Sequence, residues 1–312
     1  MGIDECIDDL TEEFLESIPQ PSRPMALFRW VGGKGNLAVW IAQFIPRGKV
    51  YVEPFAGAAS VFWHLPGSYP IEVLNDVDER IVNLYRVLQE RDRFRRLLQR
   101  LVWTPYSRAE FARALDTLQD PDADDVSRAW AFFVAQNQGF GGATGTTEGN
   151  WGRSLTSSSR GMAGTTNRWR GRLKLLTYWR ERLSRVQIDS VDGIEAIRYW
   201  DTPDTVFYVD PPYVLDTRVD KDLYVNELGL DDHRRLVDTL LEVKGKVVLS
   251  GYDHPVYRPL EDAGWMKIAR ETACHVAGRT RGSGIRGSGS AMAKIPRTEV
   301  LWTNCQPQMR LF

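Results

Sequence analysis

One short segment constrains the fold more than any other part of the chain: the apolar run Val206 to Val209 leads directly into Asp210-Pro211-Pro212-Tyr213. A continuous apolar run of this length predicts a buried strand. Each proline fixes φ at about −65° and lacks a backbone N–H, so the carbonyls of this segment can only accept hydrogen bonds. The sequence therefore predicts a carboxylate, two rigid carbonyls and an aromatic ring at the end of a buried strand.

The chemistry of this segment suits an amine. The Asp210 carboxylate and the proline carbonyls together can accept from an exocyclic NH2 group, and the Tyr213 ring can stack on a flat heterocycle at about 1–3 kcal/mol per base. Adenine and cytosine carry both features. The alternative is structural, because Pro and Asp are common where strands stop and Tyr213 would then only cover the core.

Length and composition describe an ordinary globular protein. With 312 residues the chain exceeds the usual size of one compact core, so one large domain or two are expected. Hydrophobic residues at 43% and charged residues at 26% exclude a disordered chain, and no apolar run reaches the length of a membrane span. Residues 1–17 carry seven acids and no Lys or Arg, the opposite of a targeting peptide, so a cytoplasmic protein is expected.

Cysteine and histidine usage gives no sign of a disulfide framework or a metal site. The three cysteines, Cys6, Cys274 and Cys305, are odd in number and far apart. The four histidines show no ligand spacing either. We therefore expect reduced, structural cysteines and no metal.

Basic residues are concentrated in two segments, although the net charge of the chain is only −1. Residues 151–186 hold nine Arg or Lys against one acid, and residues 267–297 hold seven against one, in part within a Gly/Ser-rich stretch. Such segments neutralise phosphates, although many are only solvated linkers. We expect nucleic-acid contacts from six of these residues: Arg153, Arg160, Arg168, Arg170, Arg281 and Arg286.

The pattern of apolar residues predicts an α/β protein with a doubly wound sheet and an inserted, mainly helical domain. The expected strands are Lys49–Val52, Ile71–Leu74, Val186–Ile188, Val206–Val209, Lys246–Ser250 and Val300–Trp302. The expected helices are Asp4–Ser17, Ile81–Leu101, Arg108–Leu118, Val126–Gln136 and Trp169–Leu183, and a turn plus helix is expected at Ala56–Leu65. Residues 139–164, rich in Gly, Thr and Ser, are expected to be irregular.

Acidic residues stand at the ends of three of the expected strands: Glu53, Asp76 and Asp210. Ligands of doubly wound sheets bind beyond the carboxyl ends of the strands, so these acids predict a cationic or hydroxyl-rich ligand. The segment Glu53 to Ala59 contains small residues but no dinucleotide fingerprint, and the chain has no phosphate loop, which favours a nucleoside without phosphates. Asp76 is placed like an acid that binds ribose hydroxyls; as an alternative it caps the next helix.

These motifs occur in an order that resembles the Dam-like, alpha-group DNA adenine-N6 methyltransferases. That family has an aromatic-Trp-x-Gly-Gly-Lys segment, a Glu-Pro-Phe-x-Gly segment, an Asn-Asp pair and Asp-Pro-Pro-Tyr. The corresponding segments here are Phe28 to Lys34, Tyr51 to Ala58, Asn75-Asp76, Asp210 to Tyr213 and a closing Thr298 to Asn304. The ordered set is far more specific than any one member.

The resemblance implies a Rossmann-like methyltransferase that uses S-adenosylmethionine and flips adenine out of DNA, as in restriction-modification systems. It implies catalytic roles for Asp210, Pro211, Pro212 and Tyr213, and a cofactor pocket formed by Trp30, Lys34, Glu53, Phe55, Gly57, Asp76, Asp192 and Asp210. It implies four parts: an acidic extension (1–24), a first catalytic part (25–95), a target-recognition insertion (96–184) and a second catalytic part (185–312). The chain departs from the family at Gln138 to Thr144, where relatives place a base-reading loop, and at Ala59, where many keep a Gly, so no target sequence is carried over.

The charge of the reacting groups implies direct methyl transfer. A sulfonium methyl is electrophilic, whereas the adenine amine is a poor nucleophile until Asp210 and the Pro211 carbonyl accept its protons. No covalent enzyme intermediate is needed, and no cysteine lies in a Pro-Cys motif. Four alternatives stay open: methylation of RNA adenine, of cytosine N4, of protein glutamine, or a catalytically silent DNA-binding relative.

Overall fold

The computed structural model describes residue 21 and residues 25–30, 32–65, 69–139, 151–214, 228–273 and 296–306. Several expectations lie outside these residues: the helix Asp4–Ser17, the contacts of Arg281 and Arg286, the states of Cys6 and Cys274, and much of the irregular segment 139–164.

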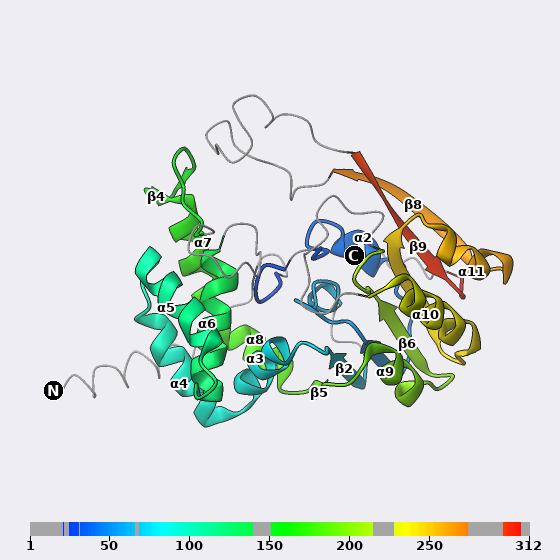
Figure 1. Cartoon of the computed structure of the whole chain (residues 1–312), viewed down its shortest axis with the longest axis horizontal. Helices are drawn as coiled ribbons and strands as arrows, with labels where there is room; N and C mark the ends of the chain where they lie inside the picture. The colour runs from blue at the N-terminus through cyan, green and yellow to red at the C-terminus, as the bar shows by residue number, and fades with distance from the viewer. Residues whose placement is uncertain are drawn as a thin grey trace.

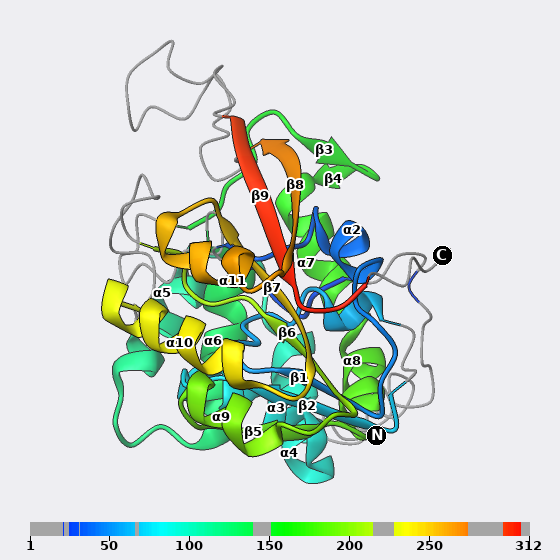
Figure 2. The same cartoon turned by 90° about the vertical axis from the view of Figure 1, so that its right-hand side faces the viewer.

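A seven-stranded sheet forms the centre of the molecule (Figures 1 and 2). Its strands in order are β5 (Gln187–Asp189), β2 (Ile71–Asn75), β1 (Val50–Glu53), β6 (Thr205–Val209), β7 (Lys246–Tyr252), β9 (Pro296–Thr303) and β8 (Met266–Ala273). The first five pair in parallel, whereas β9 runs antiparallel to both β7 and β8. This order confirms the predicted α/β fold with a Rossmann-like sheet.

Alternation along the central strand β6 divides the core into two layers. Val206 and Tyr208 pack into one buried cluster, while Phe207 and Val209 pack into the other. Successive side chains of a strand point to opposite faces, so a continuously apolar strand is what a sheet covered on both faces requires. All five residues of β6 are buried accordingly.

Helices cover both faces of the sheet. One face is covered by α9 (Gly193–Trp200), α10 (Leu230–Glu242) and α11 (Arg258–Asp262), together with the short turn η4 (Pro255–Tyr257). The other helical elements are α2 (Ala38–Ala42), η1 (Phe62–His64), α3 (Glu79–Gln89), α4 (Arg91–Val102), α5 (Arg108–Gln119), α6 (Asp125–Gln138), α7 (Gly164–Leu173) and α8 (Leu176–Leu183). Of these, α4 to α7 form the helical side of the molecule at the left of Figure 1.

Two of the expected long helices are each divided in two. The predicted helix Ile81–Leu101 breaks at Glu90, whose backbone is extended and whose N–H closes α3 on the Arg86 carbonyl. The Glu90 carboxylate then accepts from the N–H groups of Asp92 and Arg93 and so caps α4. The predicted helix Trp169–Leu183 likewise divides between α7 and α8.

The other differences from the expected elements are local. The turn plus helix predicted at Ala56–Leu65 contains less helix than expected: turns with Gly57 and Ala59 at φ of +50° are followed only by the short helix η1. The segment expected to be irregular contains a hairpin of β3 (Ser158–Ser159) and β4 (Met162–Ala163), with Arg160 and Gly161 at positive φ in its turn. Strand β8 was not predicted, because charged residues interrupt its apolar residues. Charged residues are common in a strand such as β8, which forms one edge of the sheet.

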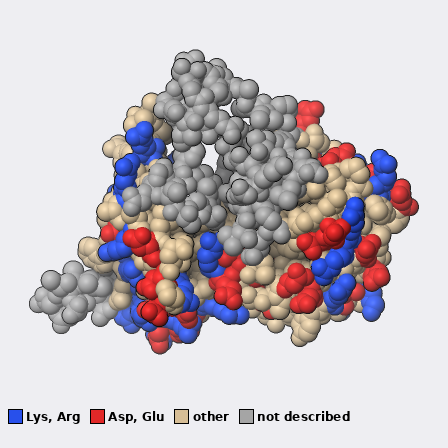
Figure 3. Space-filling model, viewed as in Figure 1, with Lys and Arg blue, Asp and Glu red and all other residues tan. Residues whose placement is uncertain are grey.

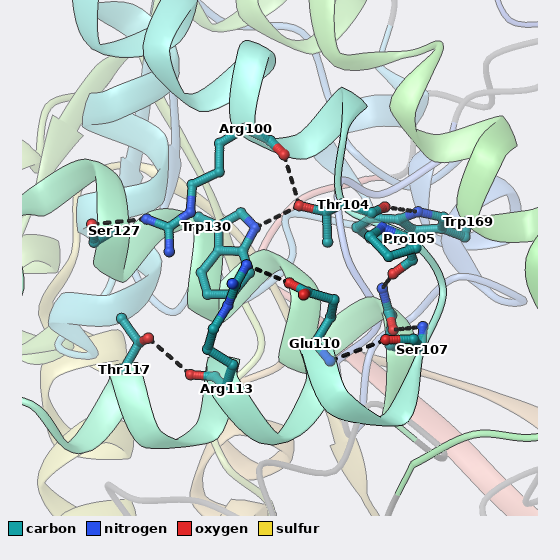
Figure 4. Close-up of polar contacts among 11 residues, drawn as sticks. Arg100, Thr104, Pro105, Ser107, Glu110, Arg113, Thr117, Ser127, Trp130 and Trp169 are labelled. Atoms are coloured by element: carbon teal, nitrogen blue, oxygen red, sulfur yellow. Dashed lines mark hydrogen bonds and ion pairs between the residues drawn. The ribbon is translucent and has the colours of Figure 1, made fainter.

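A polar network around Thr104 ties the helices α4, α6 and α7 together (Figure 4). The Thr104 hydroxyl donates to the Arg100 carbonyl at 2.7 Å and accepts from Trp130 Nε1 at 2.8 Å. The Thr104 carbonyl accepts from Trp169 Nε1 at 3.1 Å. The Arg100 guanidinium lies over the Trp130 ring, 3.9 Å from its centroid. One side chain thus satisfies a buried indole and fixes the contact between two helices.

We predict that Thr104→Val lowers the free energy of unfolding by about 1–3 kcal/mol, because valine leaves the buried Trp130 N–H without an acceptor. Chemical denaturation of the purified protein measures the change. Thr117→Val is the matched control, since Thr117 makes the same bond to a carbonyl four residues earlier without serving a buried donor. Equal stability losses in both variants would contradict the role given to Thr104.

Candidate functional site

A cavity of about 290 Å³ lies beyond the carboxyl ends of β1, β2 and β6. All eight residues predicted to bind the cofactor line it: Trp30, Lys34, Glu53, Phe55, Gly57, Asp76, Asp192 and Asp210. Pro211 and Pro212 line it as well, whereas Tyr213 does not. The structure therefore brings residues from five separated segments of the chain around one space, at the edge of the sheet where ligands of this fold bind.

Glu53 is the most deeply buried acid of the cavity wall, with 2% of the residue exposed. Its Oε1 accepts from the Tyr51 hydroxyl at 2.6 Å and from the Phe62 N–H at 2.9 Å. Burial nevertheless raises the pKa of Glu53 to about 8, since these two hydrogen bonds only partly offset the loss of hydration. At neutral pH the side chain is thus mainly protonated, and a cation in the cavity would favour its ionisation.

Asp76 holds the loop that follows β1. Its Oδ2 accepts from the Gly57 N–H at 2.7 Å and its Oδ1 from the Asp78 N–H at 2.9 Å. Burial raises the pKa of Asp76 to about 6 despite these bonds. The cap of α3 is Asp78, not Asp76, so the capping alternative for Asp76 is wrong.

Glycine is required at two points of the wall. Gly57 adopts φ of +50°, and a Cβ built there would lie 3.0 Å from Trp30 Cδ1. A Cβ at Gly193 would lie 2.3 Å from Phe55 Cζ. The two aromatic rings that line the cavity therefore pack directly against backbone, which fixes the width of the space between them.

Asp192 has a structural task in addition to its place in the wall. Its Oδ1 accepts from the N–H groups of Ile194 and Glu195 and so caps α9. Its Oδ2 accepts no hydrogen bond from the residues that the structure describes. A ligand contact by Asp192 would use this second oxygen.

Asp210 is held through one of its two oxygens. Its Oδ1 accepts from Lys34 Nζ at 2.6 Å and from Ser250 Oγ at 2.9 Å. Within the described part of the chain, Oδ2 accepts no hydrogen bond. The side chain is 20% exposed and lines the cavity, whereas Lys34 is 5% exposed. The carboxylate is thus fixed in orientation and keeps one acceptor oxygen for a ligand.

Tyr213 packs against Lys34. The Lys34 ammonium stands 4.5 Å from the centroid of the Tyr213 ring, and this ring meets Tyr252 edge to face at 4.6 Å. The Tyr213 hydroxyl donates to Glu299 Oε1. Tyr213 therefore contacts the site through Lys34 and is not part of the cavity wall that Trp30 helps to form.

Sequence reasoning did not single out Ser250 and Glu299. Both lie on strands at the antiparallel side of the sheet, Ser250 on β7 and Glu299 on β9. The signal for Glu299 was present, because it belongs to the closing Thr298 to Asn304 segment. A buried acid in an apolar strand is unusual without a partner.

The basic residues divide into an exposed group and a structural group. Arg153, Arg160, Arg168 and Arg170 are exposed along the β3–β4 hairpin and α7, where blue side chains gather at the upper left of Figure 3. Arg172 instead donates to the Ala26 carbonyl at 2.6 Å, and Arg182 binds both oxygens of Glu72.

Arg29 is a further basic residue close to Arg168 of the exposed group. Burial, together with the charges of Arg29 and Arg168, lowers the pKa of Arg172 to about 9. Arg29 precedes Trp30 of the cavity wall, and its pKa is lowered by burial and by Arg168. Three guanidiniums thus repel one another where the N-terminal segment meets α7, and an anion there would relieve the repulsion.

No helix in the described ranges has the length and apolar character to cross a membrane. Cys305, the one cysteine in those ranges, is half-buried and has a free thiol.

Comparison with solved structures yields distant similarities. A putative RNA methyltransferase from Pyrococcus horikoshii is 9% identical, with 96% of this chain and 97% of that chain covered and a TM-score of 0.35. An rRNA methyltransferase from Streptomyces viridochromogenes is 13% identical, with 93% and 89% covered and a TM-score of 0.35.

Sequence comparison yields DNA adenine methylases. The chain is 25% identical over 286 residues to the DNA adenine methylase of Vibrio cholerae serotype O1. These aligned residues cover 89% of this chain and 96% of that protein. It is 30% identical over 120 residues to the DNA N-6-adenine-methyltransferase of Escherichia phage P1 (38% and 16% covered) and 31% identical over 122 residues to the DNA adenine methylase of Salmonella typhi (38% and 42% covered). The chain thus spans less than half the length of these last two relatives.

The family match extends over most of the chain. Residues 30–273 match the family described as D12 class N6 adenine-specific DNA methyltransferase. This range runs from the first residue of the cavity wall to the last residue of β8. It takes in every strand of the central sheet except β9, together with the helical side of the molecule, and the chain belongs to the D12 class of N6 adenine-specific DNA methyltransferases.

Proposed function

We propose that this protein transfers a methyl group from S-adenosylmethionine to the N6 amine of adenine in DNA. Family membership supports the reaction class. The single observation that carries the proposal is the state of Asp210, a residue of the cavity wall whose Oδ1 is fixed by Lys34 and Ser250 while Oδ2 accepts no hydrogen bond from the described residues. An acceptor prepared in this way suits an amine that must lose a proton.

The cavity wall fits S-adenosylmethionine. Three acids, Glu53, Asp76 and Asp210, surround the space, and the ligand carries an ammonium, a sulfonium and two ribose hydroxyls but no phosphate. Asp76 stands where ribose is held in related folds, and Trp30 and Phe55 offer flat apolar surfaces. When bound, the cofactor supplies an electrophilic methyl group on a sulfonium.

The residues of the chain supply position and charge. We assign to Asp210 Oδ2 and the Pro211 carbonyl the two N–H hydrogen bonds of the target amine, so that the nitrogen lone pair is held toward the cofactor side. The amine keeps one proton on methylation, and Asp210 Oδ2 accepts the proton that is lost. Pro212 keeps the backbone rigid, and the Tyr213 ring stacks on the extruded base. No nucleophilic side chain is required, and Cys305 does not line the cavity.

DNA is held, in this proposal, by the helical side of the molecule, with residues 96–184 as the target-recognition part. Exposed Arg153, Arg160, Arg168 and Arg170 lie along the hairpin and α7 and would contact phosphates, and Arg29 extends this surface toward the cavity. RNA adenine and cytosine N4 stay as alternatives, because the same acceptors suit those amines. Incubation of duplex DNA and matched RNA with labelled methyl donor, followed by identification of the methylated nucleoside, tests the proposal; product other than N6-methyldeoxyadenosine would overturn it.

We predict that Asp210→Ala lowers methylation by about 10³-fold or more while DNA binding stays near the wild-type level, because the change removes the amine acceptor and no DNA-binding surface. Single-turnover assays and DNA titrations measure the two effects. Asp231→Ala, a change at an exposed aspartate on α10 that pairs with Arg234, is the control. Retained turnover in the Asp210 variant would defeat the role of this carboxylate.

We predict that the affinity for S-adenosylmethionine rises with pH up to about 8, the pKa of Glu53 in the free protein. The bound cation lowers this pKa, so the complex holds fewer protons and the dissociation constant falls by up to about tenfold per pH unit below that value. Above it the dependence flattens. Calorimetric titration at several pH values checks the slope. Glu53→Gln should flatten it, and an unchanged slope in that variant would assign the proton to another group.

We predict that Arg168→Ala combined with Arg170→Ala weakens DNA binding and lowers the slope of log affinity against log salt by about 2, roughly one unit for each lost phosphate contact. Titration of a fluorescent duplex over a range of salt concentrations measures this slope. The double change Arg234→Ala with Arg235→Ala removes two exposed arginines from α10 and is the matched control. Equal slopes for the two double variants would exclude Arg168 and Arg170 from the interface.

A further inference from the structure

Glu299 is a buried carboxylate beside the candidate site that the proposed chemistry leaves unused. Its Oε1 lies 3.8 Å from Lys34 Nζ and accepts from the Tyr213 hydroxyl, and its side chain is only 4% exposed. The sheet fixes its position, because β9 pairs antiparallel with β7 and places Glu299 opposite Tyr252. Tyr252 in turn packs against the Tyr213 ring. Glu299 thus reaches two predicted site residues at once.

The charge of Glu299 calls for an explanation. Burial raises the pKa of this carboxyl group, and Lys34 and the Tyr213 hydroxyl act in the opposite direction. Burial of a charge costs stability even when it is paired. A neutral glutamine would offer Tyr213 an equally placed acceptor, so the hydrogen bond alone does not account for an acid here. The remaining partner of the charge is the Lys34 ammonium.

Lys34 stands between two carboxylates. It lies 2.6 Å from Asp210 Oδ1 and 3.8 Å from Glu299 Oε1. If the Lys34 ammonium pairs with Asp210 alone, it weakens the Asp210 carboxylate as a hydrogen-bond acceptor for the substrate amine. This effect is relieved when Lys34 has a second carboxylate, and Glu299, which does not line the cavity, supplies it.

We propose that Glu299 is a positioning residue for methyl transfer: it shares the Lys34 ammonium with Asp210 and holds the Tyr213 hydroxyl, so that Asp210 accepts the substrate amine while the Tyr213 ring keeps its orientation. Glu299 does not line the cofactor cavity and touches no reacting atom. Its effect therefore falls on the methyl-transfer step and not on cofactor affinity. This inference rests on the proposed function.

Glu299→Gln tests the inference because it keeps the size and the acceptor for Tyr213 but removes the charge. We expect the single-turnover methylation rate to fall by about tenfold to a hundredfold. The dissociation constant for S-adenosylmethionine and the thermal midpoint stay near their wild-type values. Glu271→Gln, the same change at an exposed position on the neighbouring strand β8, is the matched control and keeps full activity.

Two outcomes would overturn the inference. One is wild-type turnover in Glu299→Gln; the other is a turnover loss matched by an equal loss of cofactor affinity, which would mark a purely structural residue. Should this variant fail to fold, Glu299→Asp replaces it, since it keeps the charge but withdraws it by one methylene. The inference then requires slower methylation at unchanged cofactor affinity, and wild-type turnover of Glu299→Asp would refute it.

Failure of the inference and failure of the proposed function give different results. If the wild-type protein methylates no polynucleotide, the proposed function fails and the role of Glu299 in it fails too. If the wild-type protein methylates DNA and Glu299→Gln does so at the same rate, only the role of Glu299 is lost.

Discussion

The ion pair of Lys34 with Asp210 is the interaction on which the site depends. It joins the segment before β1 to the end of β6, across 176 residues of chain. Burial of two charges is costly unless further hydrogen bonds are present, and here Ser250 donates to the carboxylate while the Gly32 carbonyl accepts from the ammonium at 3.2 Å. The pair fixes the N-terminal segment across the edge of the sheet and fixes the orientation of the Asp210 carboxylate.

Around this pair the fold gathers several buried acidic side chains. Glu53, Asp76 and Glu299 all have raised pKa values, and burial is the first cause in each case. Stability alone would favour fewer buried acids, so their presence together indicates a site formed for a ligand. A cation is the ligand that such a group of acids favours.

The strands with a site acid at their end were predictable, because apolar runs and the acids that follow them are local features of the sequence. The positions of Glu53, Asp76 and Asp210 followed from the fold rule alone. Glu299 was missed, because its contact with Tyr213 depends on antiparallel pairing between β7 and β9, which no local pattern reveals. The turn plus helix expected at residues 56–65 contains only one short helix, η1, and the positive φ of Ala59 in the turn reflects its surroundings and not its residue type.

The helical side of the molecule is not an independent unit. Its buried residues and those of the sheet form one cluster, in which Trp130 of α6 and Tyr51 of β1 both belong. Phe132 of α6 packs against Phe28 and Trp30, while Arg172 and Trp179 donate to the carbonyls of Ala26 and Met25. The segment that carries Lys34 into the site therefore rests on the helices whose surface carries the exposed arginines. Because packed cores transmit displacement instead of absorbing it, a shift of these helices would be felt at the cavity wall.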